Sequence, residues 1–355
     1  MPTTVRIGTR ASTLALTQTG LVAAELARLG DLAVELVEVR TEGDRATGSL
    51  ATLGGTGVFV TALRDALLND RCDIAVHSLK DLPTLPFEGI VLGGTPPRED
   101  PRDVLCAREG WTLETLPLRA RVGTGSPRRA AQLLAVRPDL EVVDIRGNVD
   151  TRLGRVAPGD LDAVVLARAG LARLGRLDAV TQEIDPHVMT PAPGQGALAI
   201  EVRAPGTPDS LGLELAQALA ALDDPRTRLA ILAERALLAA LEAGCAAPVG
   251  ALARVEDAPD ASSPARIHLD VVVIRTDGSA ELRRSASLPL PGPVAEHVSG
   301  FDEALRPLDR SGPVALGSRE QELRAIALGD ALAEELLTAG AARLAAVGPR
   351  APEAL

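Results

Sequence analysis

The amino-acid sequence predicts an α/β fold of two lobes with largely parallel sheets, followed by a smaller α+β domain. Short strand-like runs alternate with helical stretches over the first two-thirds of the chain. Proline-rich segments at 95–101 and 191–196 interrupt this alternation and are typical of crossings between lobes. From about residue 226 the pattern changes to one long helix, two paired strands and a last helix. A chain of 355 residues has room for these parts.

The spacing of apolar residues predicts the elements in order. A first helix at 14–29 has an apolar face and ends at Gly30. Strands are expected at 5–8, 34–40, 73–77, 104–107, 121–123, 141–145 and 162–167, and a second helix at 58–68. In the last third, helices at 226–241 and 320–337 flank strands at 267–275 and 280–288. Surface loops are expected at 257–265 and 289–317.

Composition excludes several classes of protein. A net charge of −11 and only four aromatic residues argue against a nucleic-acid binder, which needs a basic face and stacking side chains. No apolar run is long enough to cross a membrane, and no signal peptide is visible. Three scattered cysteines form neither a disulfide framework nor a metal site. We therefore expect a cytoplasmic, monomeric protein without a metal.

A lysine and an aspartate follow one expected strand end. Lys80 is the only lysine beside 36 arginines, and Asp81 comes directly after it. A carboxylate beside a fixed cation can act as a general acid or base, or stabilise a developing cation. The alternative is a surface ion pair worth about 0–1 kcal/mol. The single lysine favours the functional interpretation, because Arg replaces Lys everywhere else.

Two adjacent arginines start the helix after the strand at 121–123. Ser126 fits the N-cap and Pro127 the first helical position, so Arg128 and Arg129 lie in the first turn. Cations there oppose the helix dipole, which indicates that the site holds an anion. The alternative is a plain helix cap. The segment matches neither a dinucleotide fingerprint nor a P-loop.

Further arginines stand at other strand ends. Arg10 precedes the first helix, Arg146 and Arg152 flank a cap at Asn148, and Arg173 follows a later strand. Together they suit a ligand with several carboxylates, although Arg10 alone also fits a solvated capping loop. A loop cysteine, Cys245, is compatible with an inert buried thiol or an exposed nucleophile, and the residues around it leave both open.

Six segments in order resemble the porphobilinogen deaminase family, also called hydroxymethylbilane synthases. They are residues 6–10, 73–81, 99–103, 146–149 and 194–197 and the Gly244-Cys245 loop. The resemblance implies a transferase that joins four porphobilinogen molecules head to tail, releases ammonia at each step, and yields hydroxymethylbilane for haem biosynthesis. It also implies a dipyrromethane cofactor bonded by a thioether to Cys245.

The resemblance further implies roles for individual residues. Asp81 matches the catalytic aspartate. Positions that bind the cofactor are matched by Lys80, Asp81, Thr124, Ser126, Arg128, Arg129, Arg146 and Cys245. Positions near the substrate or growing chain are matched by Arg10, Ser12, Phe59, Arg152, Arg173 and Gln195. The implied fold has two lobes like those of type II periplasmic binding proteins. Residues 1–100 with 195–221 form lobe 1, 101–194 form lobe 2, and 222–355 form the α+β domain with the cysteine loop.

The sequence departs from the family pattern at three places. Thr56 stands where members usually have lysine, Gly125 and Pro127 alter the arginine motif, and Ala243 replaces a common glycine. One alternative is therefore a degenerate relative that binds the cofactor without turnover. Another is a non-catalytic two-lobed anion-binding protein, which would be exported and would need neither Asp81 nor a third domain.

Overall fold

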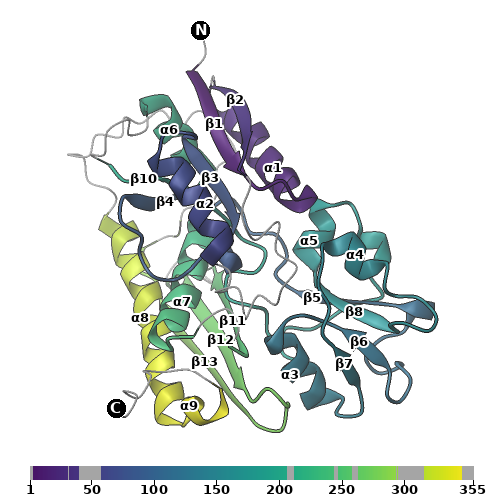
Figure 1. Ribbon diagram of the computed structural model, residues 1–355. Coiled ribbons are helices and arrows are strands. Elements are labelled where there is room, and N and C mark those ends of the chain that lie inside the picture. The colour runs from purple at the N-terminus through teal and green to yellow at the C-terminus, as the bar shows by residue number, and fades with distance from the viewer. Residues whose placement is uncertain are drawn as a thin grey trace, which may run out of the picture.

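A computed structural model describes residues 3–30, 32–39, 57–205, 212–243, 247–257, 263–292, 294 and 316–345. Figure 1 shows three bodies, which we call lobe 1, lobe 2 and the third domain. Within the described ranges, no helix has the length and apolar character needed to cross a bilayer. The same ranges contain no cluster of three or more side chains suited to a metal ion.

Lobe 1 is a five-stranded sheet, in the order β2-β1-β3-β10-β4, covered by three helices. Its strands are β1 (Thr3–Thr9), β2 (Leu32–Glu38), β3 (Ile74–Ser78), β4 (Ile90–Gly94) and β10 (Leu198–Arg203), and its helices are α1 (Thr13–Leu29), α2 (Gly57–Leu68) and α6 (Leu213–Leu222). Helix α1 begins where Ser12 accepts a hydrogen bond from the Ala15 amide (3.3 Å), as an N-cap should.

Lobe 2 is a second five-stranded sheet, in the order β7-β6-β8-β5-β9. Its strands are β5 (Asp103–Ala107), β6 (Arg121–Gly123), β7 (Glu141–Val143), β8 (Ala163–Ala167) and β9 (Gln182–Glu183), and its helices are α3 (Pro127–Val136), α4 (Val149–Leu153) and α5 (Arg168–Arg173). The predicted cap and first turn of α3 are confirmed, with Ser126 at the N-cap and Pro127 at the start of the helix.

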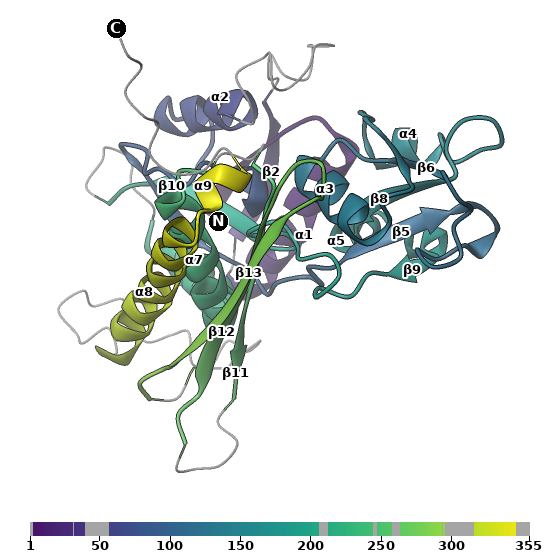
Figure 2. The same cartoon turned by 90° about the horizontal axis from the view of Figure 1, so that it is seen from below.

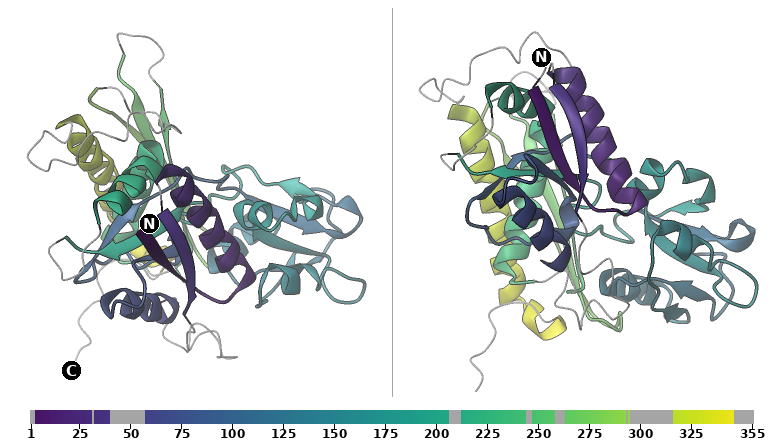
Figure 3. Two further views of the ribbon diagram at one scale, coloured as in Figure 1. Left: turned by 90° about the horizontal axis from the view of Figure 1, so that it is seen from above. Right: turned by 45° about the horizontal axis from the view of Figure 1, so that its top comes forward.

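The two lobes exchange strands through the two crossings. In each sheet only the strand that arrives from the other lobe, β10 or β5, runs against its neighbours. The sheets are therefore largely parallel, as predicted, with one reversed strand each. This reciprocal arrangement is the two-lobed fold of type II periplasmic binding proteins, so the predicted fold class is confirmed. Figures 1 and 3 show that α1 of lobe 1 also approaches α5 of lobe 2.

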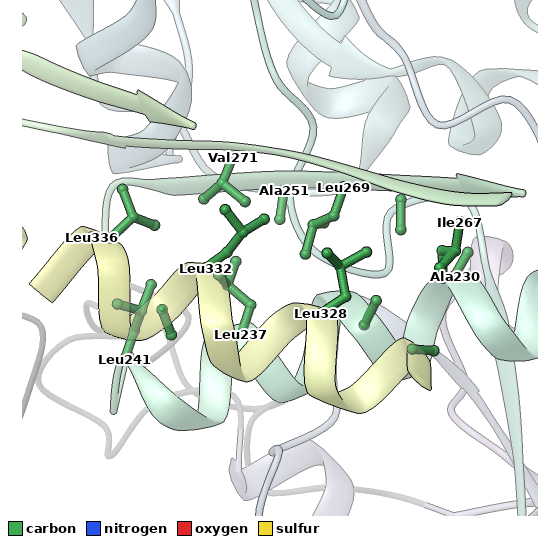
Figure 4. Packing of buried hydrophobic residues seen from close by; sticks show 14 of the residues in the cluster. Ala230, Leu237, Leu241, Ala251, Ile267, Leu269, Val271, Leu328, Leu332 and Leu336 are labelled. Atoms are coloured by element: carbon green, nitrogen blue, oxygen red, sulfur yellow. The ribbon is translucent and has the colours of Figure 1, made fainter. Parts of the chain in front are cut away.

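The third domain is an antiparallel sheet, β11-β12-β13, with two long helices on one face. Its elements are α7 (Pro225–Ala240), β11 (Val249–Glu256), β12 (Arg266–Ile274), β13 (Glu281–Pro289), α8 (Leu316–Thr338) and α9 (Ala341–Leu344). Figure 4 shows Leu328, Leu332 and Leu336 of α8 facing Leu269 and Val271 of the sheet. Burial of such apolar side chains, each worth about 1.5–3 kcal/mol, makes this domain a body with its own core.

The expected elements agree with the structure to within a few residues at their ends. Strand 34–40 is shifted to 32–38, and strand 141–145 is shorter than expected at 141–143. The two expected surface loops fall largely outside the described residues.

Candidate functional site

Lys80 and Asp81 lie at the carboxyl end of β3, in the middle of the lobe 1 sheet. A single 3-10 turn, Leu79–Asp81, follows the strand and presents both side chains half-buried. Leu79 holds the turn in place, because its side chain is buried (1% exposed) and its amide donates to the Ala197 carbonyl just after the second crossing (3.0 Å). The turn is therefore fixed, and the positions of Lys80 and Asp81 are fixed with it.

The two arginines that open α3 share one buried carboxylate. Arg128 Nη2 donates to Asp103 Oδ2 (2.8 Å), and Arg129 Nη2 donates to Asp103 Oδ1 (2.7 Å). Asp103 is fully buried and both arginines nearly so. Asp103 is thus one anion that these two side chains hold; the further anion that the sequence predicts at this helix start stays a prediction. Burial alone would raise the pKa of Asp103, but Arg128 and Arg129 lower it to about 2.

Two further expected residues, Gln195 and Thr124, lie around this pair. Gln195, 1% exposed, donates through Nε2 to Asp103 Oδ1 (2.8 Å) and to the Pro101 carbonyl (2.7 Å). Thr124 is buried at the end of β6, where its hydroxyl accepts from the Ser126 amide (3.2 Å). Gln195 and Thr124 thus brace the arginine site.

Lys80 of lobe 1 faces the arginines of lobe 2. Loss of hydration and the nearby Arg129 lower the pKa of Lys80 to about 8, although Asp81 and Asp103 act in the opposite direction. Because Arg129 and Arg128 act on the pKa of Lys80, cations from both lobes lie close to one another. The predicted association of Lys80, Arg128 and Arg129 is present in the structure.

Arg152 and Arg146 extend the same positive region. Arg152 Nε donates to the Gly147 carbonyl (2.8 Å), and its pKa is lowered by burial and by the neighbouring Arg129 and Arg146. Arg146 is exposed, and its Nε lies 3.9 Å from an Asp144 carboxylate oxygen. We call Lys80, Arg128, Arg129, Arg146 and Arg152 the cationic cluster.

Arg173, at the end of α5, reaches the second crossing. Its Nη2 donates to the Gly196 carbonyl (2.6 Å). Burial lowers the pKa of Arg173, whereas the nearby Glu99 carboxylate acts in the opposite direction. With Glu99 and Arg98, Arg173 lines a cavity of about 400 Å³ against α1. The expectation that Arg173 acts with the other arginines on one ligand stays a prediction.

The remaining expected residues differ in how far the structure describes them. Arg10 is half-buried just after β1, and Ser12 caps α1. Phe59 lies in the first turn of α2, with its side chain outside the described residues. Cys245 and Thr56 also lie outside them. Cys72 and Cys106 are buried free thiols, as expected, and burial raises the pKa of both.

The sequence analysis missed two carboxylates that are 0% exposed, Asp103 and Glu234. Asp103 was overlooked because its arginine partners lie more than twenty residues further along the chain. Glu234 is the other, on α7 with no exposure. A pattern signal exists for Glu234, since it falls on the buried stripe of α7 between Ala230 and Leu237.

Glu234 ties the third domain to both crossings. Its carboxylate accepts from Arg98 Nη1 (2.6 Å) in the first crossing and from the Gly194 amide (2.5 Å) in the second. It also accepts from the Ala253 amide (2.7 Å) of β11. Three segments distant in sequence thus share one carboxylate, which fixes the hinge between the lobes to the third domain.

Fold and site define a two-lobed protein that gathers cations of both lobes into a binding site for an acidic small molecule. A family model described as "Porphobilinogen deaminase, dipyromethane cofactor binding domain" matches residues 5–208, and one for the C-terminal domain of that enzyme matches 228–289. The chain belongs to the porphobilinogen deaminase family. The resemblance found in the sequence is confirmed.

Similar proteins agree with this membership. The chain is 56% identical over 320 residues to a porphobilinogen deaminase of Cutibacterium acnes, covering 86% of this chain and 94% of that protein. It is 52% identical over 341 residues to one of Leifsonia xyli subsp. xyli, covering 96% and 94%. A periplasmic substrate-binding protein from Coxiella burnetii aligns over 61% of this chain and 91% of its own with a TM-score of 0.40 and 15% identity, too distant to bear on function.

Proposed function

We propose that Asp81 is the catalytic carboxylate of this chain and that the cationic cluster holds the acidic side chains of its cofactor and substrate. As a member of its family, the chain is a transferase of tetrapyrrole biosynthesis with a dipyrromethane cofactor. The observation that carries the residue assignment is the approach of Lys80, next to Asp81, to the arginines of lobe 2.

The residues present fit a dipyrromethane. That group carries four carboxylates, an acetate and a propionate on each pyrrole. The cationic cluster has five cations, and among the described residues the carboxylates that act on it are Asp81, Asp103 and Asp144. Burial lowers the pKa of Lys80 and of Arg152 because it removes water that would stabilise their charged forms. Carboxylates of a bound ligand would stabilise those charged forms in place of the water. When bound, the group supplies the pyrrole carbon to which substrate units are joined.

We assign its attachment to Cys245 by a thioether. Support comes from the family model for the cofactor-binding domain and from the position of Cys245 in sequence, between α7 and β11. The other two cysteines are buried within lobe cores, which leaves neither suited to attachment. Within this assignment, Thr124 and Ser126 orient the start of α3 toward the cofactor.

Asp81 acts on the substrate where ammonia leaves. Breaking the C–N bond of the protonated aminomethyl group expels neutral ammonia, which takes the bonding electron pair, and leaves the positive charge spread over the substrate pyrrole. A carboxylate held near that charge lowers the energy of the transition state, because it is already in place when the charge develops. Lys80 pairs with a carboxylate of the ligand. This pairing keeps the positive charge of Lys80 away from the carbon that becomes positive.

Other residues are assigned to the substrate. Arg10 and Arg152 bind the acetate and propionate of incoming porphobilinogen, and Ser12 and Phe59 are assigned to the same substrate. Gln195 acts by positioning, since it braces Arg129 and Asp103. Arg173 is assigned to the substrate or growing chain, and its hydrogen bond to the Gly196 carbonyl holds it at the second crossing.

The domain boundaries proposed from sequence are supported by sheet membership. Residues 1–100 with 195–221 supply the lobe 1 sheet, 101–194 the lobe 2 sheet, and 222–355 the third domain. We further propose a monomer in the cytoplasm that binds no nucleic acid and no membrane. Free thiols at Cys72 and Cys106 and the net charge of −11 support this.

The experiment that tests the catalytic assignment compares Asp81→Asn with Asp144→Asn. Both remove one negative charge facing the cationic cluster, but Asp144 is exposed (70%). We expect Asp81→Asn to lower kcat by about 100-fold or more while the cofactor stays attached. Asp144→Asn should retain kcat within about threefold. Near-normal product formation by Asp81→Asn would sink the assignment.

A further inference from the structure

The turn between β12 and β13 lies directly on the helix that carries Arg128 and Arg129. Figures 1 and 2 place the tip of this hairpin beside α3. A Cβ built on Gly278 would lie 2.6 Å from the Ala135 amide nitrogen and 2.8 Å from the Ala131 carbonyl oxygen. These are backbone atoms of α3, so the contact leaves no room for any side chain at 278.

The turn is rigid in itself. Asp277 Oδ1 accepts from the Ser279 amide (2.9 Å), and the Gly278 amide donates to the Arg275 carbonyl (2.9 Å). Gly278 has a φ of +73°, which glycine adopts without penalty. Behind the tip, Ala131 of α3 packs with Val272 and Ile274 of β12, all fully buried. Because the turn is rigid and rests on these buried apolar side chains, it can hold α3 in one position.

A second contact links the same helix to the third domain through Thr190. Arg128 Nη1 donates to the Thr190 carbonyl (2.6 Å), and Gln132 Oε1 accepts from the Thr190 amide (2.8 Å). On the opposite side, a Cβ on Gly250 of β11 would lie 2.7 Å from the same carbonyl. Arg283 of β13 donates to the nearby His187 carbonyl (2.9 Å). Helix α3 is thus held by the third domain at two places.

We infer that the β12–β13 turn is a positioning element, which sets the arginines of α3 against the domain that carries Cys245. The inference rests on the proposed function, because it assigns the turn the task of aligning the cofactor's carboxylates with its attachment point. Gly278 touches no reacting atom and acts through α3. Arg283 acts in the same way from the side of the hairpin.

The distances at Gly278 show how far a side chain there would push α3 away from the turn. Ordinary van der Waals contact begins at 3.4 Å, so a Cβ at 2.6 Å requires the turn and α3 to separate by several tenths of an ångström. Misplacement of catalytic or binding groups by about 1 Å can cost about 100-fold in rate. We expect kcat to fall by about 10- to 100-fold, together with slower loading of the cofactor.

The test compares Gly278→Asn with Gly292→Ala. Asparagine tolerates positive φ better than other non-glycine residues but still adds a Cβ, so Gly278→Asn probes the contact rather than the backbone angle. Gly292 has nearly the same φ, +71°, with nothing within 4 Å of its Cβ position, and controls for angle alone. The readouts are kcat and KM of the folded holoenzyme, and the rate of covalent loading by intact mass.

Gly278→Asn should lower kcat and slow loading, whereas Gly292→Ala should match wild type. A purely structural role would lower the unfolding temperature but leave kcat of the folded holoenzyme unchanged, and that result overturns the inference. An active, loaded wild type with an equally active Gly278→Asn variant overturns it while the proposed function stands. A wild type that neither loads nor turns over contradicts the proposed function, and the inference with it.

A second pair of variants decides the matter should Gly278→Asn fail to fold. Arg283→Ala removes the hydrogen bond to His187 without adding atoms, and Arg284→Ala removes a neighbouring arginine that bonds Glu335 within the third domain (2.6 Å). Arg283→Ala should lower kcat by about 2- to 10-fold, the worth of one hydrogen bond. Equal activity of the two variants overturns the inference.

Discussion

Neutralising Glu234 should weaken the contacts between the third domain and the two crossings that join the lobes. In Glu234→Gln the side chain keeps its shape but loses its charge, and its amide nitrogen cannot accept a hydrogen bond. Arg98, with its side chain 10% exposed, then keeps a buried positive charge without a counter-charge. One of the amides of Gly194 and Ala253 also loses an acceptor.

The size of the effect follows from burial. Removing one partner of a buried ion pair costs about 3–5 kcal/mol, because the other charge stays buried and uncompensated. Since a typical protein is stable by only about 5–15 kcal/mol, this is a large share of the total. The assay is urea unfolding followed by circular dichroism, with the free energy of unfolding compared between variant and wild type.

The matched control is Glu25→Gln. Glu25 pairs with Arg28 one turn away on α1, but the pair is largely exposed, so its loss should cost about 0.2–0.5 kcal/mol. The double variant Arg98→Met with Glu234→Leu should be more stable than Glu234→Gln, because no buried charge remains. A Glu234→Gln variant as stable as Glu25→Gln would refute the reasoning.

Three further predictions concern the cationic cluster. In the cofactor-free protein Lys80, the only lysine, should be acylated by an amine reagent with a midpoint near pH 8, and the midpoint should rise in the loaded enzyme; an unchanged midpoint argues against a carboxylate beside it. Asp103→Asn should lose about 3–5 kcal/mol of stability at pH 7. Because folding lowers the pKa of Asp103 to about 2, its contribution is complete above the unfolded value near 4, and the gap should close as pH falls from about 4 to 2 in urea titrations. Arg146→Ala should leave stability unchanged, since Arg146 is exposed, but slow cofactor loading measured by intact mass; a fully loaded variant contradicts its role.

Local patterns predicted most of the elements and the strand ends that carry polar groups, but they missed the strands β4, β9, β10 and β11. Ser126 and Pro127 mark a helix start because capping depends on residues a few positions apart. The same reasoning could not supply Asp103 as the partner of the two arginines, since burial and pairing depend on how β5 passes α3.

The third domain shows the same limit. Its helices and hairpin follow from apolar spacing, and Asp277-Gly278 is a turn signal in any hairpin. That this turn lies on α3 depends on the packing of three domains, which no local pattern records.

The most direct test of the account is the intact mass of the purified protein with and without Cys245. Wild type should exceed its sequence mass by a covalent adduct of two pyrrole units, and Cys245→Ser should lack it. Cys106→Ser, which alters a buried thiol in lobe 2, should keep the adduct. An active wild type at its plain sequence mass, or a Cys245→Ser variant that still carries the adduct, would contradict the assignment of the cofactor to this residue.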